Sequence, residues 1–296
     1  MRSFKRKASD IIELRVVAYL VVGLFAFFAL FPFAVLLVNS FSSEHAILNY
    51  GYELIPREIS FRAYEMIFEN PMKMLRTYGL TIFIAGFGTA VSLFFSTMAA
   101  FVISRKELRY RNILSFFLYF TTLFNGGLVP YYLLISKAFH LQNTIAVMLI
   151  VPMFSVINIL ILRNFIANSI PDSLFESARI DGANDFAMFI RIVLPLSGPA
   201  LASIGLLTAL GYWNDWWTPM MFVPRESMWP LQYTLYNILA SINFAANMVN
   251  NLPLSSMPSE SLKLAMTVVA TGPIIFAYPF VQRYFVKGIT MGAIKG

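Results

Sequence analysis

The residues that could do chemistry are concentrated in two short segments, and the first lies inside an apolar stretch. It contains Tyr212, Trp213, Asn214, Asp215, Trp216 and Trp217. An ionised Asp215 at the centre of a bilayer would cost roughly 2.5–3.5 kcal/mol, so we expect it to face protein or water rather than lipid. Aromatic faces beside amide and carboxylate oxygens suit a sugar, which offers apolar C–H patches and hydroxyl donors. The cluster is therefore a candidate substrate path. A second interpretation stays open: it caps or breaks a helix, and its aromatic residues mark a membrane interface.

The second segment, residues 169–195, is polar and lies between two apolar stretches. Pro171 suits the first position of a helix, and Glu176 lies toward the positive end of that helix dipole. Gly182 can adopt the left-handed conformation that ends a helix, and Asn184 can cap the next one. Pro195 is expected to stop that second helix. The pattern predicts two short helices joined by a tight turn, which on residue types alone is equally well a solvated amphipathic loop.

Enzyme chemistry is not indicated anywhere in the chain. There is no Cys, and the two histidines, His45 and His140, lie far apart in sequence without other metal ligands near them. The phosphate-binding pattern G-x-x-x-x-G-K-[ST] is absent, and no nucleophile–base pair occurs in the apolar stretches. We therefore expect no catalytic residue, no metal site and no cofactor on this chain.

Composition predicts an all-α membrane protein. Of the 296 residues 58% are hydrophobic and 12% are charged, about half the charged share of an ordinary soluble domain. The apolar residues gather in blocks of about twenty, the length of a helix that crosses a bilayer, and do not alternate as in a β-barrel. We expect one transmembrane domain, residues 16–296, with six spans near 16–38, 80–104, 113–135, 144–162, 198–223 and 262–281.

The basic residues predict the orientation of these spans. Most of the 22 Lys and Arg fall in segments that lie on one side if residues 1–15 are cytoplasmic. The tail 283–296 and the polar segment 169–195 are then cytoplasmic, and residues 224–260 form an external loop. A net charge of +7 is explained by these basic cytoplasmic ends, so no nucleic acid partner is expected. The third span is interrupted at residues 125–127, which indicates either a kink or backbone exposed along a pathway.

The order of residues in the polar segment resembles the E-A-A motif of permeases in ABC-type importers. Glu176, Ala178 and Gly182 fall at its spacing, followed by Ile192, Leu194 and Pro195, and the string is similar to the carbohydrate-uptake branch. Ser177 stands where alanine is usual, and its small side chain still permits close packing. The resemblance implies a coupling segment that docks in a cleft of a separate ATPase subunit. The residues implied in that contact are Glu176, Ser177, Ala178, Asp181, Gly182, Ala183 and Pro195.

Similarity to the maltose-type permeases extends from about Leu80 to Gly296. Trp213-Asn214-Asp215 resembles the W-N-D signature of their fifth span, and residues 288–296 resemble the tail of the second maltose permease. That resemblance implies an ATPase-contacting tail with Gly288, Gly292, Lys295 and Gly296. In the maltose-type relative, the loop equivalent to 224–260 reaches into the binding protein. Within the family, the chain looks nearest to permeases for complex oligosaccharides, including alginate-type importers.

The resemblance also implies the fold and the assembly. We expect a type I ABC importer permease fold in the bacterial cytoplasmic membrane, paired with a second, non-identical permease. An ATPase dimer would carry ATP and Mg, and an extracytoplasmic solute-binding protein would deliver the sugar. Two alternatives stay open: an ABC permease for another solute, and an ion-driven secondary transporter or channel. The latter needs titratable groups in several spans, whereas Asp215 is the only carboxylate predicted inside one.

Overall fold

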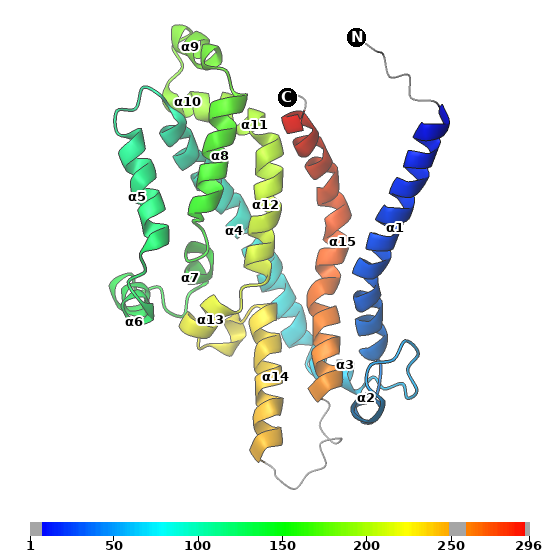
Figure 1. Cartoon of the computed structure of the whole chain (residues 1–296). Coiled ribbons are helices and arrows are strands. Elements are labelled where there is room, and N and C mark those ends of the chain that lie inside the picture. Colours follow the sequence, from blue (N-terminus) through cyan, green and yellow to red (C-terminus); the bar gives the residue numbers. More distant parts are fainter. Residues whose placement is uncertain (1–7, 249–258, 294–296) are drawn as a thin grey trace. The chain divides into compact units, whose positions relative to one another are not determined.

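The structure is a computed structural model that describes residues 8–248 and 259–293 (Figure 1). Every regular element in these residues is helical, and the one β pairing among them is an isolated bridge between Ser42 and Ile59. The expected all-α class is confirmed. The chain divides into two compact units, one formed by residues 1–69 and 238–272 and the other by 70–237 and 273–296.

The first unit begins with the long helix α1, Ala8–Asn39, whose side chains from Leu14 to Phe33 are exposed and largely apolar. Such a surface is suited to lipid contact. The expected external loop after it contains two short helices, α2 (Glu44–Tyr50) and α3 (Arg62–Ile67). Asn39 ties the end of α1 to this loop, because its amide donates to the carbonyl of Glu53 (2.7 Å) and accepts from the N–H of the same residue (3.0 Å).

A buried carboxylate joins this loop to the last helix, α15 (Ser259–Ala293). Glu44 is only 6% exposed, and its oxygens accept the backbone N–H groups of Glu260 (3.0 Å) and Ser261 (2.9 Å). The hydroxyl of Ser261 also donates to it (3.0 Å). The first N–H groups of a helix have no partner within the helix and carry a partial positive charge, so the carboxylate stabilises the start of α15.

The core of the second unit is formed by three helices, α4 (Pro71–Ser104), α8 (Val156–Ser169) and α12 (Gly198–Trp213). Small residues let α4 and α12 approach closely: a Cβ at Gly88 would lie 2.8 Å from the ring of Tyr212, and one at Gly205 would lie 3.0 Å from Leu93. Close contact between small residues is a common way to pack helices in membranes, where the hydrophobic effect gives no net attraction.

Several helices of this unit are broken. The third expected span consists of α5 (Arg111–Leu123) and a second piece, α6 (Leu128–Leu133) with the π-helix η1 (Leu134–Ala138), which meet at 115°. At the break Gly127 has φ +92° and its N–H donates to the side chain of Asn125 (2.8 Å), which replaces a helical hydrogen bond. The expected continuous fourth span is also divided, into α7 (Ile145–Ile150) and α8, on either side of Pro152, which has no N–H to continue the helix.

The remaining expected boundaries differ in similar ways. The fifth span ends at Trp213, and a short helix α13 (Trp217–Phe222) follows after a break. The expected external loop 224–260 contains the 3₁₀ turn η3 (Glu226–Met228) and the 18-residue helix α14 (Leu231–Met248). The helix α14 was not predicted from the sequence, because the many asparagines and tyrosines of this stretch indicated a loop. The expected tail 283–296 is helical up to Ala293 as part of α15.

Two helices of the described chain are long and apolar enough to cross a membrane, α1 over Leu14–Asn39 and α4 over Pro71–Ser104. The number rises to four if the bent pair around residues 124–127 and the pair Asp185–Leu196 with Gly198–Trp213, bent by 80°, each count as one span. Spanning helices are therefore present, while the full set of six spans stays a prediction.

We expect Gly88→Ala to lower the thermal unfolding temperature of the purified protein. The added methyl overlaps the buried ring of Tyr212, and overpacking of this kind costs about 1–3 kcal/mol. Gly86→Ala is the matched control on the same helix, because nothing lies within 4 Å of its Cβ and alanine favours helix over glycine. Equal unfolding temperatures for the two variants would contradict close α4–α12 packing at Gly88.

Candidate functional site

The polar segment after α8 folds into the two short helices that the sequence indicates, α9 (Asp172–Ile180) and α10 (Asp185–Met188). Pro171 immediately precedes α9 in an extended conformation, and Asn184 caps α10 by accepting the N–H of Ala187 (2.8 Å). Gly182 in the turn has φ +78°, the conformation that glycine adopts without strain. The N–H of Ala183 returns to the carbonyl of Ala178 (2.8 Å), which closes the end of α9.

After α10 the chain continues through the π-helix η2 (Phe189–Val193) and the single turn α11 (Leu194–Leu196). Pro195 thus lies within this turn, and the helix ends one residue after it rather than at it. The direction changes by 80° between this stretch and α12. Pro195 has no N–H for a bond to the preceding turn, which favours such a change of direction.

One side chain of α9 anchors the segment to the core. Phe175 is 4% exposed and packs against Phe101 at the end of α4, with ring centroids 5.7 Å apart. The guanidinium of Arg105 lies over the ring of Phe175, 4.3 Å from its centroid. Phe175 was not identified from the sequence as the anchoring residue. Leu174 is exposed, so the anchoring residue is its neighbour.

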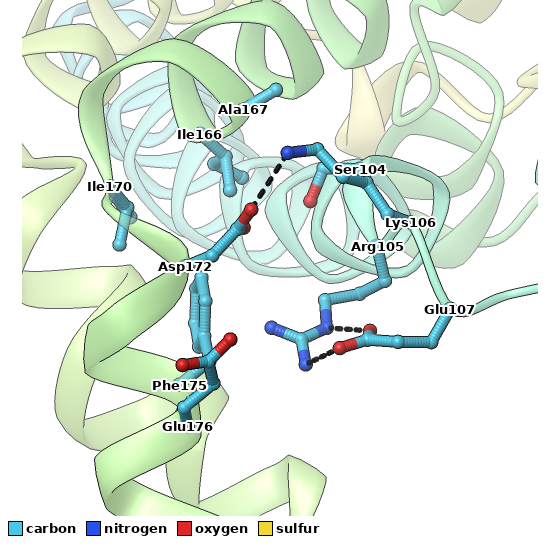
Figure 2. Close-up of a pocket in the computed structure, with 10 residues that line it drawn as sticks. All are labelled: Ser104, Arg105, Lys106, Glu107, Ile166, Ala167, Ile170, Asp172, Phe175 and Glu176. Atoms are coloured by element: carbon cyan, nitrogen blue, oxygen red, sulfur yellow. Dashed lines mark hydrogen bonds and ion pairs between the residues drawn. The ribbon is translucent and has the colours of Figure 1, made fainter.

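Ion pairs hold α9 against the turn between α4 and α5 (Figure 2). Lys106 donates to the carboxylate of Asp172 (2.7 Å) at the start of α9. Glu107 pairs with Arg105 (3.1 Å) and with Arg179 at the end of α9 (3.2 Å). The hydrogen bond from Lys106, together with its positive charge, holds the pKa of the Asp172 carboxyl below its ordinary value of 3.8.

A hollow of about 200 Å³ lies between α9, the end of α8 and this turn. Figure 2 shows Asp172 reaching across it to Lys106, with Phe175 and Glu176 along one side and Arg105 with Glu107 along the other. The lining residues are Ser104, Arg105, Lys106, Glu107, Ile166, Ala167, Ile170, Asp172, Phe175 and Glu176. The hollow is therefore lined mostly by polar side chains.

The other side of the segment is exposed, and we call it the elbow surface; it is formed by the exposed and half-buried residues between 174 and 186, with Phe175 beneath it. Ile180 is 87% exposed and Phe186 is 62% exposed, and the carboxylates of Glu176 and Asp181 lie near them in sequence and are also exposed. Ser177 and Gly182 are exposed, while Ala178 and Ala183 are half-buried. Large apolar side chains exposed on a polar loop mark a surface that contacts another protein.

The aromatic cluster of the fifth span is divided between interior and surface. Tyr212 and Trp213 are buried, and the hydroxyl of Tyr212 donates to the carbonyl of Leu149 (2.7 Å). The carboxylate of Asp215 accepts the N–H groups of Trp217 (3.1 Å) and Thr218 (3.0 Å) at the start of α13. The geometry of Asp215 is therefore that of a helix cap at a break, with hydrogen bonds that stabilise its charge.

Two members of the cluster, Asn214 and Trp216, reach the surface. The indole of Trp216 stacks on the ring of Tyr236 of α14, with centroids 4.9 Å apart and an angle of 22° between the planes. Trp217 stacks instead on Tyr131 of α6. Neither Tyr131 nor Tyr236 was found from sequence, because each lies on another helix and nothing in the chain order pairs them with the cluster.

The remaining candidate residues lie in the C-terminal tail. Gly288 and Gly292 lie within α15, whereas Lys295 and Gly296 lie outside the described residues. In the parts of the chain that the structure describes, no three His, Cys, Asp or Glu side chains gather as a metal site would require.

Fold and surface define an all-helical membrane protein with exposed apolar and acidic side chains on a polar elbow between two apolar helices. The chain belongs to the family described as binding-protein-dependent transport system inner membrane component, which matches residues 89–291. The resemblance to ABC-importer permeases is thereby confirmed, as is the place of the chain in the membrane.

Individual relatives cover nearly the whole chain. The polygalacturonan/rhamnogalacturonan transport system permease protein YtcP of Bacillus subtilis (strain 168) is 36% identical over 92% of this chain and 95% of its own length. Protein LplC of the same organism is 34% identical over 90% of this chain and 89% of its own. A chain in the crystal structure of a bacterial ABC transporter involved in the import of the acidic polysaccharide alginate is 32% identical, with a TM-score of 0.75, over 95% of this chain and 99% of that one.

The Lys106–Asp172 pair predicts a pH dependence of α9. Because the pKa of Asp172 is lowered in the folded protein, the pair contributes fully above the ordinary value of 3.8 and is lost as the pH falls through the lowered value. Amide hydrogen exchange in residues 172–180 should be slower in the unaltered protein than in Asp172→Asn at pH 5 to 7, and this difference should shrink only once the pH falls below 3.8 and through the lowered pKa of Asp172.

Asp181→Asn is the control, since it removes an exposed acid of the same loop. The prediction is wrong if Asp181→Asn speeds exchange in α9 as much as Asp172→Asn does, or if the difference persists unchanged at low pH.

Proposed function

We propose that this chain is one permease subunit of an ATP-driven importer that moves an oligosaccharide across the cytoplasmic membrane, and that its elbow surface docks on a separate ATPase subunit. The substrate class is supported by the sugars after which the relatives are named. Besides YtcP, an arabinooligosaccharides transport system permease protein AraQ from Halalkalibacterium halodurans is 28% identical over 99% of this chain.

The observation that carries the docking proposal is the combination of an exposed apolar tip and a rigid base. Ile180 and Phe186 offer apolar area of the kind that is buried at the centre of protein contacts, and Glu176 with Asp181 offers charged acceptors at the rim. A docking segment that bends on contact would transmit no movement. Here Phe175 and the ion pairs to residues 105–107 hold α9 against the end of α4.

The proposed partners follow from this arrangement. ATP and Mg bind to the ATPase dimer, whose closure moves the elbow and, through Phe175 and Phe101, the cytoplasmic end of α4. A second, non-identical permease completes the pathway, and an extracytoplasmic binding protein delivers the sugar to the side that carries residues 224–260. The C-terminal residues around Gly288 and Gly292 add a second contact with the ATPase.

The experiment is Gly182→Asp in the importer isolated from its native membranes. Gly182 lies at the tip of the elbow surface with φ +78° and open space around it, so an aspartate introduces charge and backbone strain at the proposed contact without a clash inside the chain. We expect membrane insertion to be normal, and ATPase co-purification and ATP-dependent uptake to be lost.

Gly51→Asp is the matched control. Gly51 has φ +77° and also has nothing within 4 Å, but it lies in the expected external loop. It should leave ATPase co-purification unchanged, and Gly182→Asn, which tolerates the left-handed conformation without a charge, should retain most of it. Undiminished co-purification with Gly182→Asp would overturn the docking assignment.

A further inference from the structure

The surface beside the break in the fifth span contains an aromatic pair and an amide pair from two different helices. Trp216 at the start of α13 and Tyr236 of α14 are stacked and are 40% and 44% exposed. Asn214 lies two residues before Trp216, and Gln232 lies one helical turn before Tyr236. The side-chain nitrogen of Gln232 donates a hydrogen bond to the side-chain oxygen of Asn214 (3.1 Å). We call these four residues the platform.

Contacts within the protein fix the positions of the platform side chains. Asp215 fixes the start of α13 by accepting two backbone N–H groups, and this sets the position of Trp216. Tyr236 also lies beside Tyr233 of the same helix, whose ring is nearly parallel to it (16°) with the centroids 6.4 Å apart. Asn214 is oriented by its own bond to the carbonyl of Leu210 (2.9 Å). The aromatic and amide groups are therefore ordered before any ligand arrives.

The polar atoms of the platform are only partly used. In the described chain the side-chain oxygen of Gln232 accepts no hydrogen bond, and no hydrogen bond joins a charged side chain to any of the four residues. Such a surface offers flat apolar faces and neutral hydrogen-bonding groups side by side. Pyranose and furanose rings present the complementary groups, since their C–H faces pack on aromatic rings and their hydroxyls bond to amides.

The platform lies at the end of the second unit opposite α9 and α10 (Figure 1). If the elbow surface is cytoplasmic, as the proposed function requires, the platform is at the extracytoplasmic end of α12, where a sugar arrives first.

We propose that Trp216, Tyr236, Asn214 and Gln232 form a sugar-binding subsite that receives the ring face of an oligosaccharide on its entry into the permease. This rests on the proposed function and goes beyond it, because the subsite is assigned to particular residues of α13 and α14. Without charged groups, the platform holds ring faces and hydroxyls and leaves any carboxylates of an acidic sugar to other residues.

The test is uptake by the importer isolated from native membranes and reconstituted in liposomes with its binding protein at saturation. The probes are a galacturonate oligosaccharide, an arabino-oligosaccharide and an alginate oligosaccharide. For each sugar carried by the unaltered importer, Trp216→Ala and Tyr236→Ala should lower the maximal uptake rate roughly three- to tenfold, as the loss of one aromatic contact would. The ATPase rate without sugar and the yield of both permeases should not change.

Two controls accompany these variants. Trp216→Phe keeps an aromatic face and should retain most of the rate, and Tyr119→Ala removes a similarly exposed aromatic (52%) from α5 without touching the platform. The subsite is overturned alone if a probe sugar is carried and both platform variants transport it at the normal rate, as expected of aromatic residues that only mark the membrane interface. It is also overturned if the variants release the second permease. An importer that carries none of the three sugars and moves another solute overturns the substrate class and the subsite together.

Discussion

The burial of Phe175 between Phe101 and the guanidinium of Arg105 is the contact on which the position of α9 and the elbow surface depends. Burying a phenylalanine side chain contributes about 1.5–3 kcal/mol. Exposed ion pairs such as Lys106–Asp172 contribute little, because water screens their charges. The aromatic ring thus supplies most of the attachment, and the ion pairs fix the orientation of α9. A loop held only by its charges would move separately from α4.

The elbow and the W-N-D segment differ in which of their residues are exposed and which hold the local structure. In the elbow, the apolar residues Ile180 and Phe186 are exposed together with acidic residues, and the positioning residue, Phe175, is buried. In the W-N-D segment, the carboxylate of Asp215 accepts hydrogen bonds from the backbone of α13, and its neighbours Asn214 and Trp216 reach the surface. A carboxylate in an apolar stretch is therefore not by itself evidence of a ligand-binding group. A break in a helix leaves backbone N–H groups without acceptors, and a carboxylate can supply the acceptor.

Much of the local structure could be predicted from residue types, because caps and turns depend on near neighbours. Gly182 and Asn184 adopt the conformations that their chemistry favours, and the interruption around Gly127 is a sharp break. The break at Pro152 and the helix α14 were missed: apolar residues on both sides of the proline masked the first, and the many polar side chains of α14 masked the second. The pairing of Trp216 with Tyr236 could not be predicted, since it depends on the direction in which the chain leaves α13.

The π-helix between the elbow and α12 has a geometric consequence. A π turn holds one residue more than an α turn, and each residue advances a helix by about 100° around its axis. The direction in which Asp185 and Phe186 face relative to α12 therefore depends on a single extra residue within Phe189–Val193. Removal of one residue there would rotate the elbow by roughly a quarter of a turn. Every side chain of the elbow surface would still be present, but it would face in a different direction relative to α12. Chain length over these five residues is thus as strict a requirement for this segment as any of its side chains.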